Sequence, residues 1–248
     1  MELALPIRDT ELFKHTASPH ILNFLFDNPE IHLPARQLAN VTPMSERATL
    51  EAINTLEAND LVETFREGNA RHVRINRARL HKPDDPISSV PQLEFRTPLR
   101  IARQYIEDEL EEVLGIILFG SVSRGEADRK SDIDLWVLVR GDHMKRRHQA
   151  NKLANHLEQL QIPASIEISS ADSADLDSDW EAIKNQLENP SRLPPSAERY
   201  SFELIVETPQ SVLNQPDRID AEDLFGDAIT LCSSETLQRV KQELLTNE

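Results

Sequence analysis

The sequence predicts an α/β (α+β) fold built from two units: a small helical unit that ends in a β-hairpin, and a larger unit in which helices flank a mixed sheet. Apolar residues recur at helical spacing in several segments, and short apolar runs bounded by turn residues indicate strands. Three prolines predict a semi-extended linker over residues 83–96. We therefore expect one domain at residues 1–82 and a second at residues 97–248.

Helical patterns fill most of the first unit. Apolar spacing predicts a first helix over residues 19–26, which Asp27-Asn28-Pro29 ends. Pro34 predicts the start of a second helix that continues to about residue 40. Thr42-Pro43 is expected to supply the N-cap and the first-turn proline of a third helix, which Asn59-Asp60 ends.

A hairpin is predicted after these helices. Residues 61–65 and 71–76 carry the alternation of half-buried strands, and Gly68-Asn69 between them is a turn signal. Three helices followed by a hairpin resemble a winged helix-turn-helix domain. That resemblance implies DNA binding, in a protein that could form a homodimer. The alternative is a dimerisation or partner-docking module whose arginines balance neighbouring acids.

Basic residues support the DNA-binding interpretation, because they gather on the hairpin of an otherwise acidic chain. Such a cluster can contact phosphates of a duplex and position the domain on it. The third helix adds a weaker set of polar residues. The arginines expected to contact DNA are Arg47, Arg71, Arg74 and Arg77.

The second unit should open with an amphipathic helix over residues 97–113, which packs on the sheet. A further helix is expected at about residues 144–160, and a last one at about residues 235–245. The acidic segment 171–198 is interpreted as an insertion with a short helix around residues 180–187.

The most specific pattern lies between two apolar runs. The first run ends in Gly120-Ser121, and the second begins directly after Asp132-Ile133-Asp134. Alternate strand residues point to the same face, so Asp132 and Asp134 should project together. Two adjacent carboxylates repel unless a cation lies between them, and hard oxygen ligands suit Mg²⁺ bound to a nucleoside triphosphate. Gly120 permits a tight turn, while Ser121 and the amides after it offer an anion site.

These residues, with Arg124-Gly125, resemble the signature of the DNA polymerase β-type nucleotidyltransferases, most closely the minimal branch and its archaeal-type members. The resemblance covers roughly residues 97–248. It implies Mg²⁺-dependent transfer of a nucleoside monophosphate from a nucleoside triphosphate to an acceptor hydroxyl, with release of pyrophosphate. Asp132 and Asp134 would hold two Mg²⁺ ions, and Gly120, Ser121 and Arg124 would bind the triphosphate. Arg124 could instead pair with a neighbouring acid, Glu126 or Asp128.

A third carboxylate is implied by the same resemblance. Residues 202–209 read as a strand in which Glu203 and Glu207 share parity. We prefer Glu207, then Glu203, with Glu167 as another candidate. The acceptor is left open among a tyrosine of a partner toxin, as in toxin–antitoxin pairs, an RNA 3′ end and a small-molecule hydroxyl. The rival function is a DNA-binding regulator whose inactive transferase domain senses a nucleotide.

Charge and composition limit the partners. The chain has 43 acidic and 27 basic residues, with a formal net charge of −16. Such a surface opposes nonspecific contact with nucleic acid and is typical of a protein from a salt-rich cytoplasm, where salt screens self-repulsion. No apolar run has the length of a membrane span, and the N-terminus lacks the pattern of a signal peptide, so we expect a cytoplasmic protein without membrane contact.

Cysteine and histidine offer no metal motif in the sequence. The single cysteine, Cys232, excludes an internal disulfide and a cysteine cluster, and its apolar surroundings predict a packing role. The eight histidines show no spacing typical of paired metal ligands.

Overall fold

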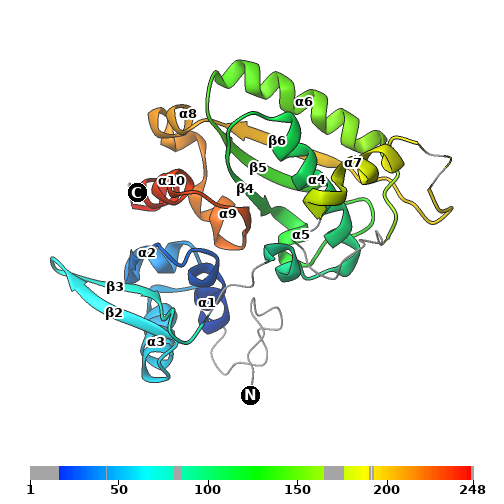
Figure 1. Cartoon of the computed structure of the whole chain (residues 1–248). Helices are drawn as coiled ribbons and strands as arrows, with labels where there is room; N and C mark the ends of the chain where they lie inside the picture. The colour runs from blue at the N-terminus through cyan, green and yellow to red at the C-terminus, as the bar shows by residue number, and fades with distance from the viewer. Residues whose placement is uncertain are drawn as a thin grey trace.

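The computed structural model describes residues 17–42, 44–80, 85–164, 176–189, 191 and 193–246. Two sheets organise them (Figure 1), one of three strands in the order β1-β3-β2 and one of four strands in the order β6-β5-β4-β7. The predicted fold class, a mixed sheet flanked by helices beside a smaller helical unit, is confirmed.

The N-terminal unit contains a helix, a short strand, two helices and a hairpin, in that order. Buried apolar residues from the helices pack on one face of the small sheet. Gly68 takes a positive φ of 60° at the hairpin turn, a conformation that glycine adopts readily. Its elements are α1 (Ala17–Asp27), β1 (Leu33–Pro34), α2 (Ala35–Asn40), α3 (Glu46–Ala58), β2 (Val62–Glu67) and β3 (Ala70–Ile75).

The start of α3 differs from the prediction. The side chain of Ser45, not that of Thr42, caps the helix and accepts a hydrogen bond from the backbone N–H of Ala48 at 3.3 Å. The Thr42 hydroxyl instead donates to the carbonyl of Leu38 at 2.9 Å, so it completes the end of α2. Pro43 lies outside the described residues. Two candidate caps three residues apart compete here, and the path of the chain after α2 selects the second.

The four-stranded sheet consists of β4 (Val113–Phe119), β5 (Ile133–Val139), β6 (Phe202–Glu207) and β7 (Ile229–Cys232). β4 pairs antiparallel with both β5 and β7, whereas β6 pairs parallel with β5. This mixed pairing brings the N-terminal end of β6 beside the N-terminal end of β5. The C-terminal end of β4 lies at the same edge, because Phe119 pairs with Asp134.

One face of this sheet is covered by α4 (Arg96–Glu109), α6 (His143–Gln159) and α7 (Leu176–Leu187) (Figure 1). The predicted insertion is part of this layer, since Trp180 of α7 is buried and its ring meets Tyr105 edge-on at 4.8 Å. The expected linker is also more structured than predicted. Its described part, from Asp85 onward, forms two 3₁₀ turns and buries apolar side chains in this core. Residues 85–95 therefore pack against the second unit.

The opposite face is covered by α8 (Pro209–Asn214), α9 (Ala221–Gly226) and α10 (Glu235–Thr246), with the N-terminal unit packed beyond them (Figure 1). One cluster of buried residues runs from Phe24 of α1 through Phe225 of α9 to Trp136 of β5. The two units therefore share a core.

A buried ammonium group joins the two units. Lys241 of α10 is fully buried, and its Nζ donates to Asn28 Oδ1 and Thr230 Oγ1, both at 2.7 Å. The same nitrogen lies 3.3 Å from the Asp27 carboxylate, which also accepts from the backbone N–H of Thr230 at 2.7 Å. Charges are retained in a protein interior when they are paired and hydrogen bonded in this way.

The single cysteine is partly buried. Burial raises the pKa of the Cys232 thiol, which suits a packing role better than a nucleophilic one.

Across the described ranges, no helix is both long enough and apolar enough to cross a membrane.

Candidate active site

The turn after β4 places a glycine against a carboxylate. Gly120 begins the short helix α5 (Gly120–Arg124) with a φ of 74°. A Cβ atom built on Gly120 would overlap Oδ2 of Asp134. Both the positive φ and the close approach require glycine here. Gly120 and Asp134, which are 14 positions apart in the sequence, are therefore in direct contact.

Three carboxylates lie together at this edge of the sheet. Asp132 precedes β5 and is exposed, and Asp134 is the second residue of β5 and partly buried. Glu203 of β6 is the register partner of Asp134 across the parallel pair, and it is exposed. Alternate residues of β6 put Glu203 on the sheet face that carries Asp134.

Electrostatics couple the three groups. The pKa of Asp134 is raised to about 6, first by burial and then by the negative charges of Glu203 and Asp132. The positive charge of Arg124 opposes this rise in part. A divalent cation would relieve this repulsion, and carboxylate oxygens are the ligands that Mg²⁺ prefers. The donor set present here therefore fits a hard divalent ion.

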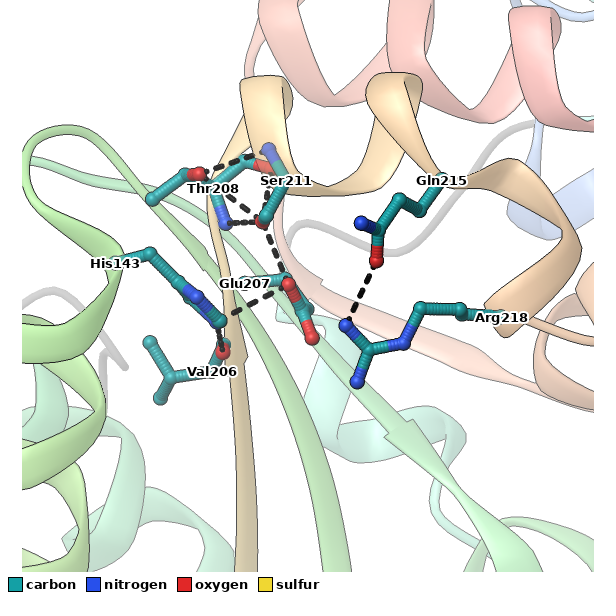
Figure 2. Close-up of polar contacts among 7 residues, drawn as sticks. All are labelled: His143, Val206, Glu207, Thr208, Ser211, Gln215 and Arg218. Atoms are coloured by element: carbon teal, nitrogen blue, oxygen red, sulfur yellow. Dashed lines mark hydrogen bonds and ion pairs between the residues drawn. The ribbon is translucent and has the colours of Figure 1, made fainter.

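Glu207 occupies a different place. It pairs in register with Leu138, four residues further along β6 than Glu203, which is about 13 Å at the usual strand rise. Its Oε2 accepts a hydrogen bond from Ser211 Oγ at 2.6 Å and lies 3.2 Å from His143 Nε2 (Figure 2). Glu207 thus supports the junction between β6 and α8. The register thus places Glu203, and not the preferred candidate Glu207, beside Asp134, and Glu167 lies outside the described residues.

The turn itself is held by local hydrogen bonds. The Ser123 hydroxyl donates to the carbonyl of Gly120 at 2.9 Å, and Gly125 ends α5 in the left-handed conformation. Arg124 donates from Nε to Glu126 at 2.8 Å, which is the pairing considered as its alternative role. Its charge still acts on Asp134. Ser121 is partly buried beside these groups.

A cleft of about 760 Å³ opens beside the carboxylates, between β6 and α6. Asp132, Glu203 and Glu207 line it on the strand side. The α6 side of the cleft was not predicted as a functional surface. Arg147, Asn151 and Asn155 line it, and their spacing of four residues puts them on one face of α6. Arg218, from the segment after α8, also lines the cleft.

The four arginines expected to contact DNA are each paired with an acid. Arg47 pairs with Glu51 at 3.0 Å within α3, and Arg71 of β3 pairs with Glu57 at 2.7 Å. The other two pairs are Arg74 with Glu63 at 2.7 Å and Arg77 with Glu30 at 2.6 Å. This is the arrangement expected of arginines that balance neighbouring acids.

Comparison with known proteins bears on the second unit. Residues 102–187 match the family model described as polymerase beta, nucleotidyltransferase. The match includes Gly120, Asp132 and Asp134 and ends before β6, so it supports a nucleotidyltransferase domain without reaching Glu203. One solved structure, the crystal structure of a toxin-antitoxin with AMP-PNP, matches at 18% identity over 60% of this chain and 82% of that chain. Its TM-score of 0.32 is too low to support an argument. No curated protein matches the chain.

Proposed function

We propose that the second unit is a Mg²⁺-dependent nucleotidyltransferase that moves a nucleoside monophosphate from a nucleoside triphosphate to an acceptor hydroxyl and releases pyrophosphate. One observation carries the proposal: the register of β6 on β5 sets Glu203 beside Asp134, which itself touches Gly120 of the turn after β4. The family match over residues 102–187 supports the same chemistry.

Each part of the site has a role in this reaction. Asp132, Asp134 and Glu203 would hold the metal ions. When bound, Mg²⁺ neutralises charge on the transferred phosphate and on the leaving pyrophosphate. The turn at Gly120 and Ser121 binds the β- and γ-phosphates through backbone amides and a hydroxyl, with Arg124 adding positive charge nearby.

The order of the strands supports one direction of attack. The phosphate-binding turn follows β4, the two aspartates belong to β5, and Glu203 belongs to β6. In-line displacement needs the acceptor on the side opposite the leaving group, which is the β6 side. Glu203 is exposed there and accepts the proton of the attacking hydroxyl as a general base. The cleft between β6 and α6 receives the acceptor.

The lining of the cleft suits a polar acceptor. Arg147 and Arg218 bring positive charge to a strongly acidic protein, and the asparagines of α6 offer hydrogen bonds in both directions. These groups fit a hydroxyl carried by a partner toxin, an RNA 3′ end or a polar small molecule. Each of the three acceptor classes is therefore tested separately in the labelling experiment.

The test uses labelled ATP, GTP, CTP and UTP with Mg²⁺ and each class of acceptor. We expect Asp134→Asn and Glu203→Gln to reduce label transfer by about 100-fold or more, as for loss of a metal ligand or a general base. Glu207→Gln is the comparison variant in the same strand. Glu207 also lines the cleft, but it accepts a hydrogen bond from Ser211 and lies about 13 Å along β6 from Glu203, so transfer should stay within about 3-fold of the unsubstituted protein.

Two outcomes would contradict this scheme. If Glu207→Gln abolishes transfer while Glu203→Gln retains it, the assignment of the third carboxylate fails. If the unsubstituted protein binds a nucleoside triphosphate but labels no acceptor, the inactive nucleotide-sensing regulator is the better reading.

The N-terminal unit favours a second function, DNA binding. Its order of elements, helix, strand, two helices and a hairpin, supports the resemblance to a winged helix. The unit carries eight acidic and seven basic residues between positions 17 and 80, so it is nearly neutral within a chain of net charge −16. The paired arginines must exchange a carboxylate for a phosphate, which predicts weak, salt-sensitive binding.

Fluorescence anisotropy with labelled duplex at several salt concentrations tests this role. Replacing Arg71, Arg74 and Arg77 with alanine should weaken binding and flatten its salt dependence. Unchanged binding after these replacements rules out the hairpin as the contact.

A further inference from the structure

Two histidines and a glutamate meet on the outer face of the small sheet. His72 of β3 pairs in register with Phe65 of β2 and with Pro34 of β1. Glu67 lies two residues after Phe65, and His32 lies two residues before Pro34. A period of two places all three side chains on one face, opposite the face whose Val73 is buried in the core.

The three side chains have the spacing of ligands to one ion. His32 Nε2 lies 3.4 Å from Glu67 Oε2, and His72 Nδ1 lies 3.7 Å from the same oxygen. One ligand atom from each residue lies within 4.8 Å of the other two. Two ligand atoms that are each about 2.0–2.1 Å from a tetrahedral ion lie roughly 3.4 Å apart. Small adjustments would therefore let one ion contact all three.

The His72 ring is held in place, but its Nδ1 atom has no hydrogen-bond partner. Its Nδ1 is buried and makes no hydrogen bond, which is costly for a polar atom. Phe65 stacks on the His72 ring at 5.6 Å and an angle of 29°, and its ring lies 5.3 Å from that of His32. The aromatic contact fixes both imidazoles, so their orientation does not depend on an ion pair with Glu67.

We propose that His32, Glu67 and His72 bind a divalent transition-metal ion of the Zn²⁺ class, separate from the carboxylate site of the second unit. Imidazole nitrogen with one carboxylate oxygen is a ligand set that suits Zn²⁺ and not Mg²⁺. The proposal does not rest on nucleotidyl transfer. A bound ion would join the hairpin, through Glu67 and His72, to the segment that leads into α2, through His32.

A Co²⁺ titration of the full chain, prepared without a polyhistidine tag, tests the site. Asp132→Asn and Asp134→Asn are introduced first, so that the carboxylate site no longer contributes. We expect one equivalent of Co²⁺ to bind with visible d–d absorption, Zn²⁺ to displace it, and saturating Zn²⁺ to raise Tm by about 5 °C.

Single substitutions then identify the ligands. His72→Ala and Glu67→Gln should each weaken Zn²⁺ binding by about 10-fold or more. His148→Ala, an exposed histidine of α6, is the matched control and should bind as before. Glu67→Gln keeps the size and polarity of an exposed side chain, so it remains informative if His72→Ala unfolds.

Three results would overturn the site. The first is binding of much less than one Co²⁺ per chain in the protein that carries Asp132→Asn and Asp134→Asn. The second is a Zn²⁺ affinity that Glu67→Gln and His72→Ala leave unchanged. The third is a Co²⁺ absorption signal that is lost when Asp132 and Asp134 are replaced. The last would assign the ion to the carboxylate site instead.

Discussion

Replacing Asp134 with asparagine removes one of three clustered negative charges and leaves the shape of the side chain nearly unchanged. In the metal-free protein, burial and the charges of Glu203 and Asp132 raise the pKa of Asp134 to about 6 from its ordinary value of 3.8. The folded state therefore binds this proton more tightly than the unfolded state does. The stability that this group contributes is fully present below pH 3.8 and is lost as the pH rises toward 6.

The size of the effect follows from the shift. About two pKa units at 1.4 kcal/mol each set an upper limit of about 3 kcal/mol. Asp134 is only partly buried, so solvent screening reduces this to about 1–2 kcal/mol. For a chain of this length, the expected rise in Tm for Asp134→Asn is about 2–6 °C.

Thermal unfolding followed by circular dichroism at pH 8 and at pH 4, with EDTA, measures the effect. Asp134→Asn should be more stable than the unsubstituted protein at pH 8, and the difference should largely vanish at pH 4. Added Mg²⁺ should stabilise the unsubstituted protein more than the variant. An unchanged or lower Tm at pH 8 in EDTA, or an equal gain at pH 4, would refute the repulsion argument.

Further substitutions test the glycine turn, the buried lysine and the end of β6. Gly120→Ala should abolish label transfer, because the added Cβ would overlap the Asp134 carboxylate. Gly68→Ala is the control, since Gly68 also has a positive φ but has open space around it, and this substitution should lower the free energy of unfolding in urea by about 1 kcal/mol. Gly120→Ala should lower it by more. Lys241→Met should cost about 3–5 kcal/mol because it buries the Asp27 carboxylate without this cation, and adding Asp27→Asn should recover part of that loss in a double-mutant cycle. Glu207→Gln should lower unfolding stability by about 1 kcal/mol, because it weakens the hydrogen bond with Ser211, and should change transfer by no more than about 3-fold.

Local patterns predicted the elements of this chain well, because they depend on neighbouring residues. The hairpin turn at Gly68, the strands around Gly120 and Asp134, and the helices α4, α6, α7 and α10 were expected from spacing and turn residues, whereas the short helices α8 and α9 were not. The third helix started later than predicted because both Thr42 and Ser45 are acceptable caps, and packing after α2 decided between them.

Long-range features could not be obtained this way. Parity puts Glu203 and Glu207 on one face of a strand, but only the pairing of β6 with β5 determines which of them stands beside Asp134. The packing of the predicted linker residues is a similar case: proline content reports local stiffness, whereas burial of Ile87 and Phe95 depends on the core that they meet.

By itself, the sequence determined the α/β class, the glycine turn and the pair Asp132 and Asp134, because each depends on residues close together along the chain. Only the tertiary structure decided which glutamate lies beside Asp134, the core shared by the two units and the meeting of His32 with His72. Those two histidines are far apart in sequence and show no metal-binding spacing, yet the pairing of three short strands brings them together. Register and packing arise from contacts between distant segments, and a linear pattern does not contain them.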